Sequence, residues 1–184
     1  MGGTFDPIHF GHLRAAESVR EAAGLDVVSF VPSGTPPHRT GPLSSALDRY
    51  AMVCLATQGH PGFLPSGVEL LREGPSYTVD TIRGWKREKP DDEVVLIVGS
   101  DTFREMPGWH EAEALFSLCT VAVAERPDSV PLPLPKRTGV LPVEGAGLAI
   151  SATDVRLRVR EGRSIRYLVP DAVADYVTKR GLYR

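Results

Sequence analysis

The sequence predicts an α/β protein with a doubly wound, mostly parallel sheet, and three observations support this fold class. Short apolar runs rich in β-branched residues, such as 26–32 and 93–100, are typical of strands buried in a parallel sheet. Segments with helical periodicity alternate with these runs, beginning with residues 11–23. Glycine, proline and polar residues follow the runs, at the strand ends where open α/β sheets bind ligands.

The same patterns predict the other elements. We place the remaining helices at residues 44–58, 79–88 and 110–118, from Ser151 onward, and after Pro170. We place one remaining strand within residues 63–71, around 68–71, and another at residues 120–124. Residues 130–142 contain PLPLPK and are interpreted as an extended surface segment, because proline at this density excludes a helix.

Composition and charge indicate an ordinary globular domain. The 184 residues carry a net charge of −2 and a pI near 6.2, which gives no support to binding of nucleic acid or of an anionic membrane. Cys54 and Cys119 lie in apolar runs and are interpreted as buried free thiols. Because no signal peptide, lipidation motif or apolar span is recognisable, we expect a cytoplasmic protein.

The opening segment, GGTFDPIHFGH at residues 2–12, predicts a phosphate-binding turn. Gly2 and Gly3 have no Cβ, so a ligand can lie against their backbone. His9 and His12 lie three residues apart at the expected start of a helix, where they share a face and where unpaired N–H groups favour an anion. On the pattern alone, a helix cap, a core histidine or half of a metal site stays open.

Two segments resemble the signatures of the nucleotidyltransferase superfamily of adenylyl- and cytidylyltransferases. The opening segment matches the first signature, whose core is HxGH or TxGH. Residues 150–156, ISATDVR, are similar to the second signature, ISSTxxR, with Ala152 in place of the second serine. The resemblance implies a Rossmann-like nucleotidyltransferase fold and three catalytic residues, His9, His12 and Arg156.

The resemblance also implies how ATP is held. The ATP-binding residues that it implies are Gly3, Thr4, Gly11, Gly99, Asp101, Ser151 and Thr153. Mg²⁺ would enter on the ATP phosphates, with no metal ligand from the protein. From the residues alone, Asp101, Ser151 or Thr153 could instead be helix caps. No GxxxxGK(S/T) segment is present, which excludes a P-loop kinase. Ser151 lacks a GxSxG context, so no nucleophile is evident and direct in-line attack without a covalent intermediate is the expected mechanism.

Five shorter segments, PPHR, PSYT, GSD, PGW and the final GLYR, resemble bacterial nicotinate-nucleotide adenylyltransferases. This resemblance implies transfer of AMP from ATP to nicotinate mononucleotide, giving deamido-NAD and pyrophosphate in NAD biosynthesis. The residues that it implies at nicotinate mononucleotide are His38, Arg39, Tyr77, Thr78, Trp109 and Arg126, with the indole stacked on the pyridine ring. Two alternatives stay open: a phosphopantetheine adenylyltransferase, and a nucleotide-binding module without catalysis.

The domain organisation expected from the resemblance is a single nucleotidyltransferase domain over residues 1–184, in which the helical part 151–184 completes the ATP site. The family places a short hydrophobic strand immediately before the glycine turn, whereas Met1 stands one residue before it here. We therefore expect the first strand to be truncated, through a misassigned start codon or a shortened chain.

Overall fold

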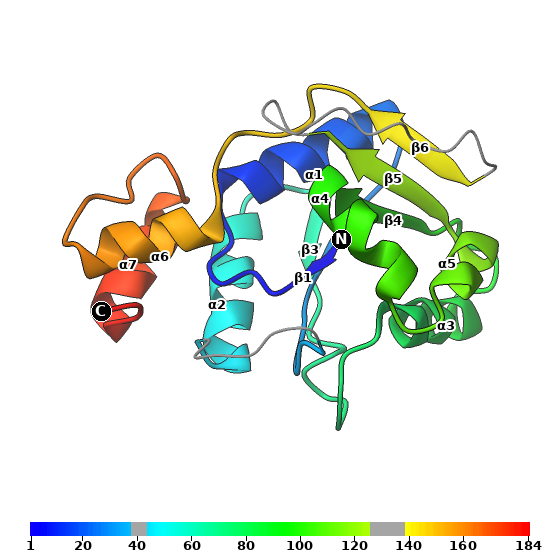
Figure 1. Ribbon diagram of the computed structural model, residues 1–184, viewed down its shortest axis with the longest axis horizontal. Helices are drawn as coiled ribbons and strands as arrows, with labels where there is room; N and C mark the ends of the chain where they lie inside the picture. Colours follow the sequence, from blue (N-terminus) through cyan, green and yellow to red (C-terminus); the bar gives the residue numbers. More distant parts are fainter. Residues whose placement is uncertain (38–43, 126–138) are drawn as a thin grey trace.

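The computed structural model describes residues 1–37, 44–125 and 139–184 and contains two parallel three-stranded sheets (Figure 1). The first sheet has the order β1-β2-β3, with strands Gly2–Gly3, Val28–Pro32 and Phe63–Pro65. The second has the order β4-β5-β6, with strands Val95–Gly99, Thr120–Ala124 and Val140–Val143. Strands β1 and β4 are in contact, so the two sheets lie side by side.

Helices connect the strands and cover both faces, as the predicted doubly wound fold requires. The helices are α1 (Phe10–Ala22), α2 (Ala46–Thr57), α3 (Thr78–Glu88), α4 (Ser100–Glu105), α5 (Ala112–Leu118), α6 (Ala152–Arg160) and α7 (Asp171–Arg180), with a 3₁₀ turn η1 at Met106–Gly108. In Figure 1, α6 and α7 lie together at one end of the molecule and α3 and α5 at the other. Among the described helices, none is long and apolar enough to cross a membrane.

The second sheet is buried on both faces, because alternate residues of its strands join different clusters. Ile97 and Ala122 pack in the cluster that includes the apolar face of α1. Their neighbours Leu96 and Val121 pack in a second cluster, with Val79, Ile82 and Leu115 of the helices on the opposite face. The period of two residues along a strand therefore explains why β4 and β5 consist of continuous apolar runs.

One predicted strand lies at a different place within its range. A strand was expected within residues 63–71, around 68–71, and the structure places it at the start of this range, as β3. Residues 67–70 form a turn, in which Leu70 N–H donates to the Gly67 carbonyl at 3.0 Å. Leu71 is 90% exposed, so this apolar residue does not mark a buried strand. Most of the expected extended segment 130–142 lies outside the described residues. Its end belongs to β6, an edge strand of the described sheet, where the exposed Pro142 is tolerated because an edge strand needs fewer ladder bonds.

The two cysteines are free, as predicted. Cys119 is buried at the end of α5, and burial raises the pKa of its thiol to about 11. Cys54 is only half-buried on α2, so the expected burial holds for Cys119 alone. A thiol with so high a pKa is unreactive at neutral pH, which agrees with a structural role for Cys119.

Candidate active site

A cavity of about 470 Å³ lies at the carboxyl ends of the strands. Gly3 ends β1, Ser33 follows β2, Gly99 ends β4 and Ala124 ends β5, and all four line this cavity. Open α/β sheets bind ligands at this edge, in the crevice between the two halves of the sheet. The cavity is therefore the candidate active site.

The two histidines of the first signature come together on the cavity wall. His9 precedes α1 as its N-cap residue and is 1% exposed, while His12 lies in the first turn. Their rings stack with centroids 3.6 Å apart and planes 21° from parallel. His9 N–H donates to Nδ1 of His12 at 3.2 Å, so the proton of a neutral His12 ring is on Nε2. The structure thus brings the two rings together on the cavity wall, and convergence of the pair on one anion stays a prediction.

The second signature meets the first at Asp6. Nη1 of Arg156 donates to the Asp6 carbonyl at 2.7 Å, and its Nη2 donates to Oγ1 of Thr153 at 3.2 Å. A Cβ on Gly11 would lie 2.9 Å from the His9 ring and 3.4 Å from the carbonyl oxygen of Ile150, so only glycine fits where the signatures approach. Segments about 140 residues apart in sequence thus build one site.

The start of α6 brings hydroxyl groups to the cavity. Ser151 is the N-cap residue, and its Oγ accepts from Asp154 N–H at 3.0 Å, as the capping alternative predicted. Ser151 and Thr153 nevertheless line the cavity. Arg156, in contrast, does not belong to the cavity wall, because its guanidinium is directed to Asp6 and Thr153.

The other residues expected at ATP also lie on the cavity wall. They are Gly3, Thr4, Gly11, Gly99 and Asp101. Asp101 is in the first turn of α4, whose N-cap residue is Gly99, so Asp101 is not the helix cap. Its carboxylate is exposed and accepts from Nη1 of Arg104 at 3.1 Å. This leaves an acidic side chain at the cavity, beside the end of a central strand.

Aromatic residues line the cavity on the side of α3 and η1. Tyr77 and Thr78 begin α3, and Trp109 follows η1, half-buried against the cluster under these helices. The rings of Tyr77 and His110 stack with centroids 4.2 Å apart. These aromatic faces suit a planar ring. Three residues expected at the second substrate lie outside the described residues, namely His38, Arg39 and Arg126.

Sequence reasoning missed several residues of the site. Thr102 and Glu105 line the cavity beside Asp101, and His110 lies next to Trp109. The spacing of Asp101 and Glu105, four residues apart on one short helix, was a signal for a shared face. Glu69 also lines the cavity; its side chain is 6% exposed, burial raises its pKa, and Oγ1 of Thr81 donates to its Oε1 at 2.6 Å.

Arg49 supports the first signature from within the protein. Its guanidinium is 2% exposed and donates to three main-chain carbonyls, those of Thr4 at 2.9 Å, Gly34 at 3.1 Å and Ser44 at 3.3 Å. Thr4 belongs to the first signature and Gly34 to the loop after β2. The sequence does contain a signal for this burial. Arg49 lies three and four residues before Met52 and Val53, so it shares the buried face of α2 with them.

A parallel α/β sheet, a cavity at its carboxyl edge and two helix starts with hydrogen-bond donors define a nucleotide-binding transferase of the α/β class. A family model described as cytidylyltransferase-like matches residues 1–158, and the chain belongs to this family.

Proteins similar to this chain over its whole length are named probable nicotinate-nucleotide adenylyltransferases. One from Thermus thermophilus is 45% identical, covering 100% of this chain and 97% of the relative. One from Geobacter metallireducens is 42% identical, covering 100% and 96%. A solved structure of the Plasmodium falciparum nicotinic acid mononucleotide adenylyltransferase, complexed with NaAD, has a TM-score of 0.85 at 19% identity, covering 99% of this chain and 94% of the other. That structural likeness supports the fold.

Proposed function

We propose that the protein transfers the AMP moiety of ATP to nicotinate mononucleotide, giving deamido-NAD and pyrophosphate in the biosynthesis of NAD. The observation that carries the proposal is that residues of both signatures line one cavity, His9 and His12 from the first and Ser151 and Thr153 from the second. The 2.7 Å hydrogen bond from Arg156 to the Asp6 carbonyl joins the two signatures behind this wall. Relatives that are 42% and 45% identical over the whole chain bear the name of this activity. The proposed place of action is the cytoplasm.

The proposed chemistry is a direct displacement at phosphorus. An oxygen of the acceptor's 5′-phosphate attacks the α-phosphorus of ATP, the bond from that phosphorus to the bridging oxygen breaks, and pyrophosphate leaves. The protein acts by positioning the two phosphates and by stabilising the charge that develops on the transferring group. We assign this role to His9 and His12, because the Nε2–H of His12 is a donor on the cavity wall.

We assign the leaving β- and γ-phosphates to the start of α6. Ser151 and Thr153 carry hydroxyl groups on the cavity wall, and the unpaired N–H groups of the first helical turn favour an anion. Arg156 adds a positive charge one turn further on, held in place by its bond to Asp6. Residues 151–184 would thus complete the ATP site of a single domain.

We propose that Mg²⁺ enters with the triphosphate. In the described ranges, no three His, Cys, Asp or Glu side chains are grouped as a metal site. The carboxylates of Asp101 and Glu105 do line the cavity, and oxygen ligands of this kind fit a magnesium ion that keeps several of its waters. When bound, the ion would neutralise charge on the phosphates.

We assign the pyridine ring of nicotinate mononucleotide to the aromatic side of the cavity. Trp109 would stack on the ring, and Tyr77 and Thr78 would contact the nucleotide from the start of α3. His38, Arg39 and Arg126 remain part of this proposed substrate site, although their positions are outside the described residues.

A pyrophosphate-release assay tests the function. The purified protein is mixed with ATP and Mg²⁺ and with one acceptor at a time: nicotinate mononucleotide, nicotinamide mononucleotide or phosphopantetheine. The expected result is release with nicotinate mononucleotide. Release with phosphopantetheine alone would establish the rival adenylyltransferase, and ATP binding without release from any acceptor would establish a non-catalytic module.

A further inference from the structure

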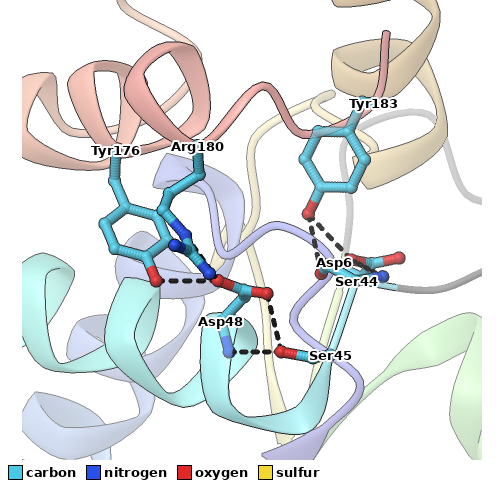
Figure 2. Close-up of polar contacts among 7 residues, drawn as sticks. All are labelled: Asp6, Ser44, Ser45, Asp48, Tyr176, Arg180 and Tyr183. Carbon is cyan, nitrogen blue, oxygen red and sulfur yellow. Dashed lines mark hydrogen bonds and ion pairs between the residues drawn. The ribbon is translucent and has the colours of Figure 1, made fainter.

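The C-terminal end of the chain reaches into the first signature. Gly181 ends α7 in the left-handed conformation, with φ of 63°, and turns the chain back toward the body of the protein. Tyr183 follows, and its hydroxyl donates to Oδ1 of Asp6 at 2.7 Å, as Figure 2 shows. Two residues that lie 177 positions apart in the sequence are therefore joined directly.

Asp6 depends on this contact because it is a buried carboxylate with few donors. The residue is 1% exposed. Its Oδ1 also accepts from the main-chain N–H of Ser44 at 3.3 Å and from the Ser44 hydroxyl, which lies 3.2 Å from the hydroxyl of Tyr183. Its Oδ2 is buried without a hydrogen-bond partner among the described residues. A buried charge without donors is costly, so each donor to Oδ1 counts.

Arg156 of the second signature fixes the main chain of Asp6. Its carbonyl accepts the 2.7 Å hydrogen bond from Arg156, while its side chain accepts from Tyr183. Asp6 lies on the cavity wall, three residues before His9. Its position therefore sets where the histidine pair stands relative to Arg156.

The Tyr183 hydroxyl remains a donor throughout the working pH range. Burial, together with the neighbouring Asp6 carboxylate, raises the pKa of the Tyr183 phenol far above its ordinary value. The phenol therefore keeps its proton at neutral pH. Its contact with Asp6 is a hydrogen bond to a carboxylate, which is a strong type of bond.

Tyr176, on α7 itself, makes a similar contact away from the cavity. The Tyr176 hydroxyl donates to Oδ1 of Asp48 at 2.8 Å, and Nε of Arg180 donates to the same oxygen at 3.2 Å (Figure 2). Asp48 is in the first turn of α2 and does not line the cavity. This contact fastens α7 to α2 without touching either signature.

We propose that Tyr183 is a positioning residue for adenylyl transfer, whose hydroxyl holds Asp6 and thereby sets the spacing between the histidine pair and Arg156. The inference rests on the proposed function. In this role Tyr183 contacts no substrate and acts through its hydrogen bond to Asp6. The chain provides its own control, because Tyr176 donates an equivalent hydrogen bond to a carboxylate that is not part of the site.

The test compares Tyr183→Phe with Tyr176→Phe. Each variant removes one hydroxyl and keeps the ring, which in both cases packs against the same apolar cluster. We expect Tyr183→Phe to lower kcat for pyrophosphate release about 10- to 100-fold, because small displacements of catalytic groups are costly in rate. The KM for nicotinate mononucleotide should change less than twofold. Tyr176→Phe should keep the wild-type kcat, although both variants should lose a similar amount of thermal stability.

Ser44→Ala, which removes the other hydroxyl beside Asp6, should lower kcat in the same direction and serves as the readout if Tyr183→Phe fails to fold. Wild-type kcat in a folded Tyr183→Phe would overturn the positioning role while leaving the activity established. Equal losses of kcat in the two phenylalanine variants would do the same. Absence of turnover in the unsubstituted protein with every acceptor would instead overturn the proposed function, and this inference with it.

Discussion

Replacing Arg49 by methionine tests how the first signature is supported. The buried guanidinium donates to three main-chain carbonyls in separate segments, those of Thr4, Gly34 and Ser44. Methionine has a similar length and no donor, so the substitution leaves these carbonyls without this donor while it keeps much of the buried volume. The free energy of unfolding should therefore fall sharply.

The size of the loss follows from the bonds removed. A hydrogen bond from a charged donor contributes about 1.5–3 kcal/mol, and a buried carbonyl left without a donor costs about 1–3 kcal/mol. The added apolar surface of methionine offsets roughly 1–2 kcal/mol. Counting each contact once, as a buried carbonyl left without its donor, three carbonyls less this offset give a net loss of about 1–8 kcal/mol, centred near 4 kcal/mol. In a domain of this size, each kcal/mol lowers the melting temperature by about 2–4 °C, so the expected fall is on the order of 10 °C.

Thermal and urea unfolding, followed by circular dichroism, measure this loss. Arg83→Met is the matched control, because Arg83 also donates two hydrogen bonds, at 2.9 and 2.6 Å, but to the exposed carboxylate of Glu111. Water screens an exposed pair, so the loss of this one should change the stability little. Arg49→Lys should recover only part of the stability, since an ammonium lacks the guanidinium fork. Equal losses in Arg49→Met and Arg83→Met would refute the reasoning.

Three further predictions concern the cavity. His12→Ala should lower kcat about 100-fold with little change in melting temperature, because a donor to the transferring phosphoryl group is lost; an unchanged rate of pyrophosphate release would remove His12 from the mechanism. Trp109→Ala should raise the KM for nicotinate mononucleotide about tenfold and the KM for ATP less, because a stacking partner is lost; separate titrations of the two substrates measure this, and equal changes would contradict the assignment. Burial raises the pKa of Glu69, so its contribution to stability is present at acid pH and is lost as pH rises through that raised value. Glu69→Gln keeps an acceptor for Thr81, and its stability relative to the wild type should increase from about pH 4 to about pH 7 in urea titrations; a difference that does not vary with pH would argue against the burial of a charge.

Much of the fold could be predicted because two periodicities dominate its local sequence. Strand β5 begins and ends where the apolar run predicts. Helix α2 begins at Ala46, and its N-cap residue Ser45 accepts from Asp48 N–H, as is typical of a capping pattern. Strand β3 was predicted within the right range but a few residues too late, because it has only three residues and its Leu64 is exposed, so neither alternation nor an apolar run marks it. Short edge elements depend on their neighbours for stability rather than on their own residues.

The residues of the site also fall into those that a local sequence pattern predicts and those that only the fold reveals. The histidine pair and the start of α6 are local patterns, so their residues could be named from the sequence, and the structure places them on one cavity. Arg49 and Tyr183 act through contacts with residues far away in the chain, and no local pattern contains their partners. Their importance is visible only once the fold has placed Thr4 and Asp6 beside them. Positioning residues of this kind are therefore the part of a site that sequence motifs describe least.

The convergence of distant segments on Asp6 is affordable in free energy because loop closure depends only weakly on length. Lengthening a closed loop tenfold, to the 150 residues that separate Asp6 from Arg156, adds about 2 kcal/mol to the entropic cost of closure. Once Arg156 is in place, Tyr183 lies only one helix further along the chain, so its bond to Asp6 closes a much shorter loop. The second contact is therefore formed at a smaller entropic cost than the first. The two contacts should form together, which makes the geometry of the histidine pair a property of the whole folded domain rather than of the opening segment alone.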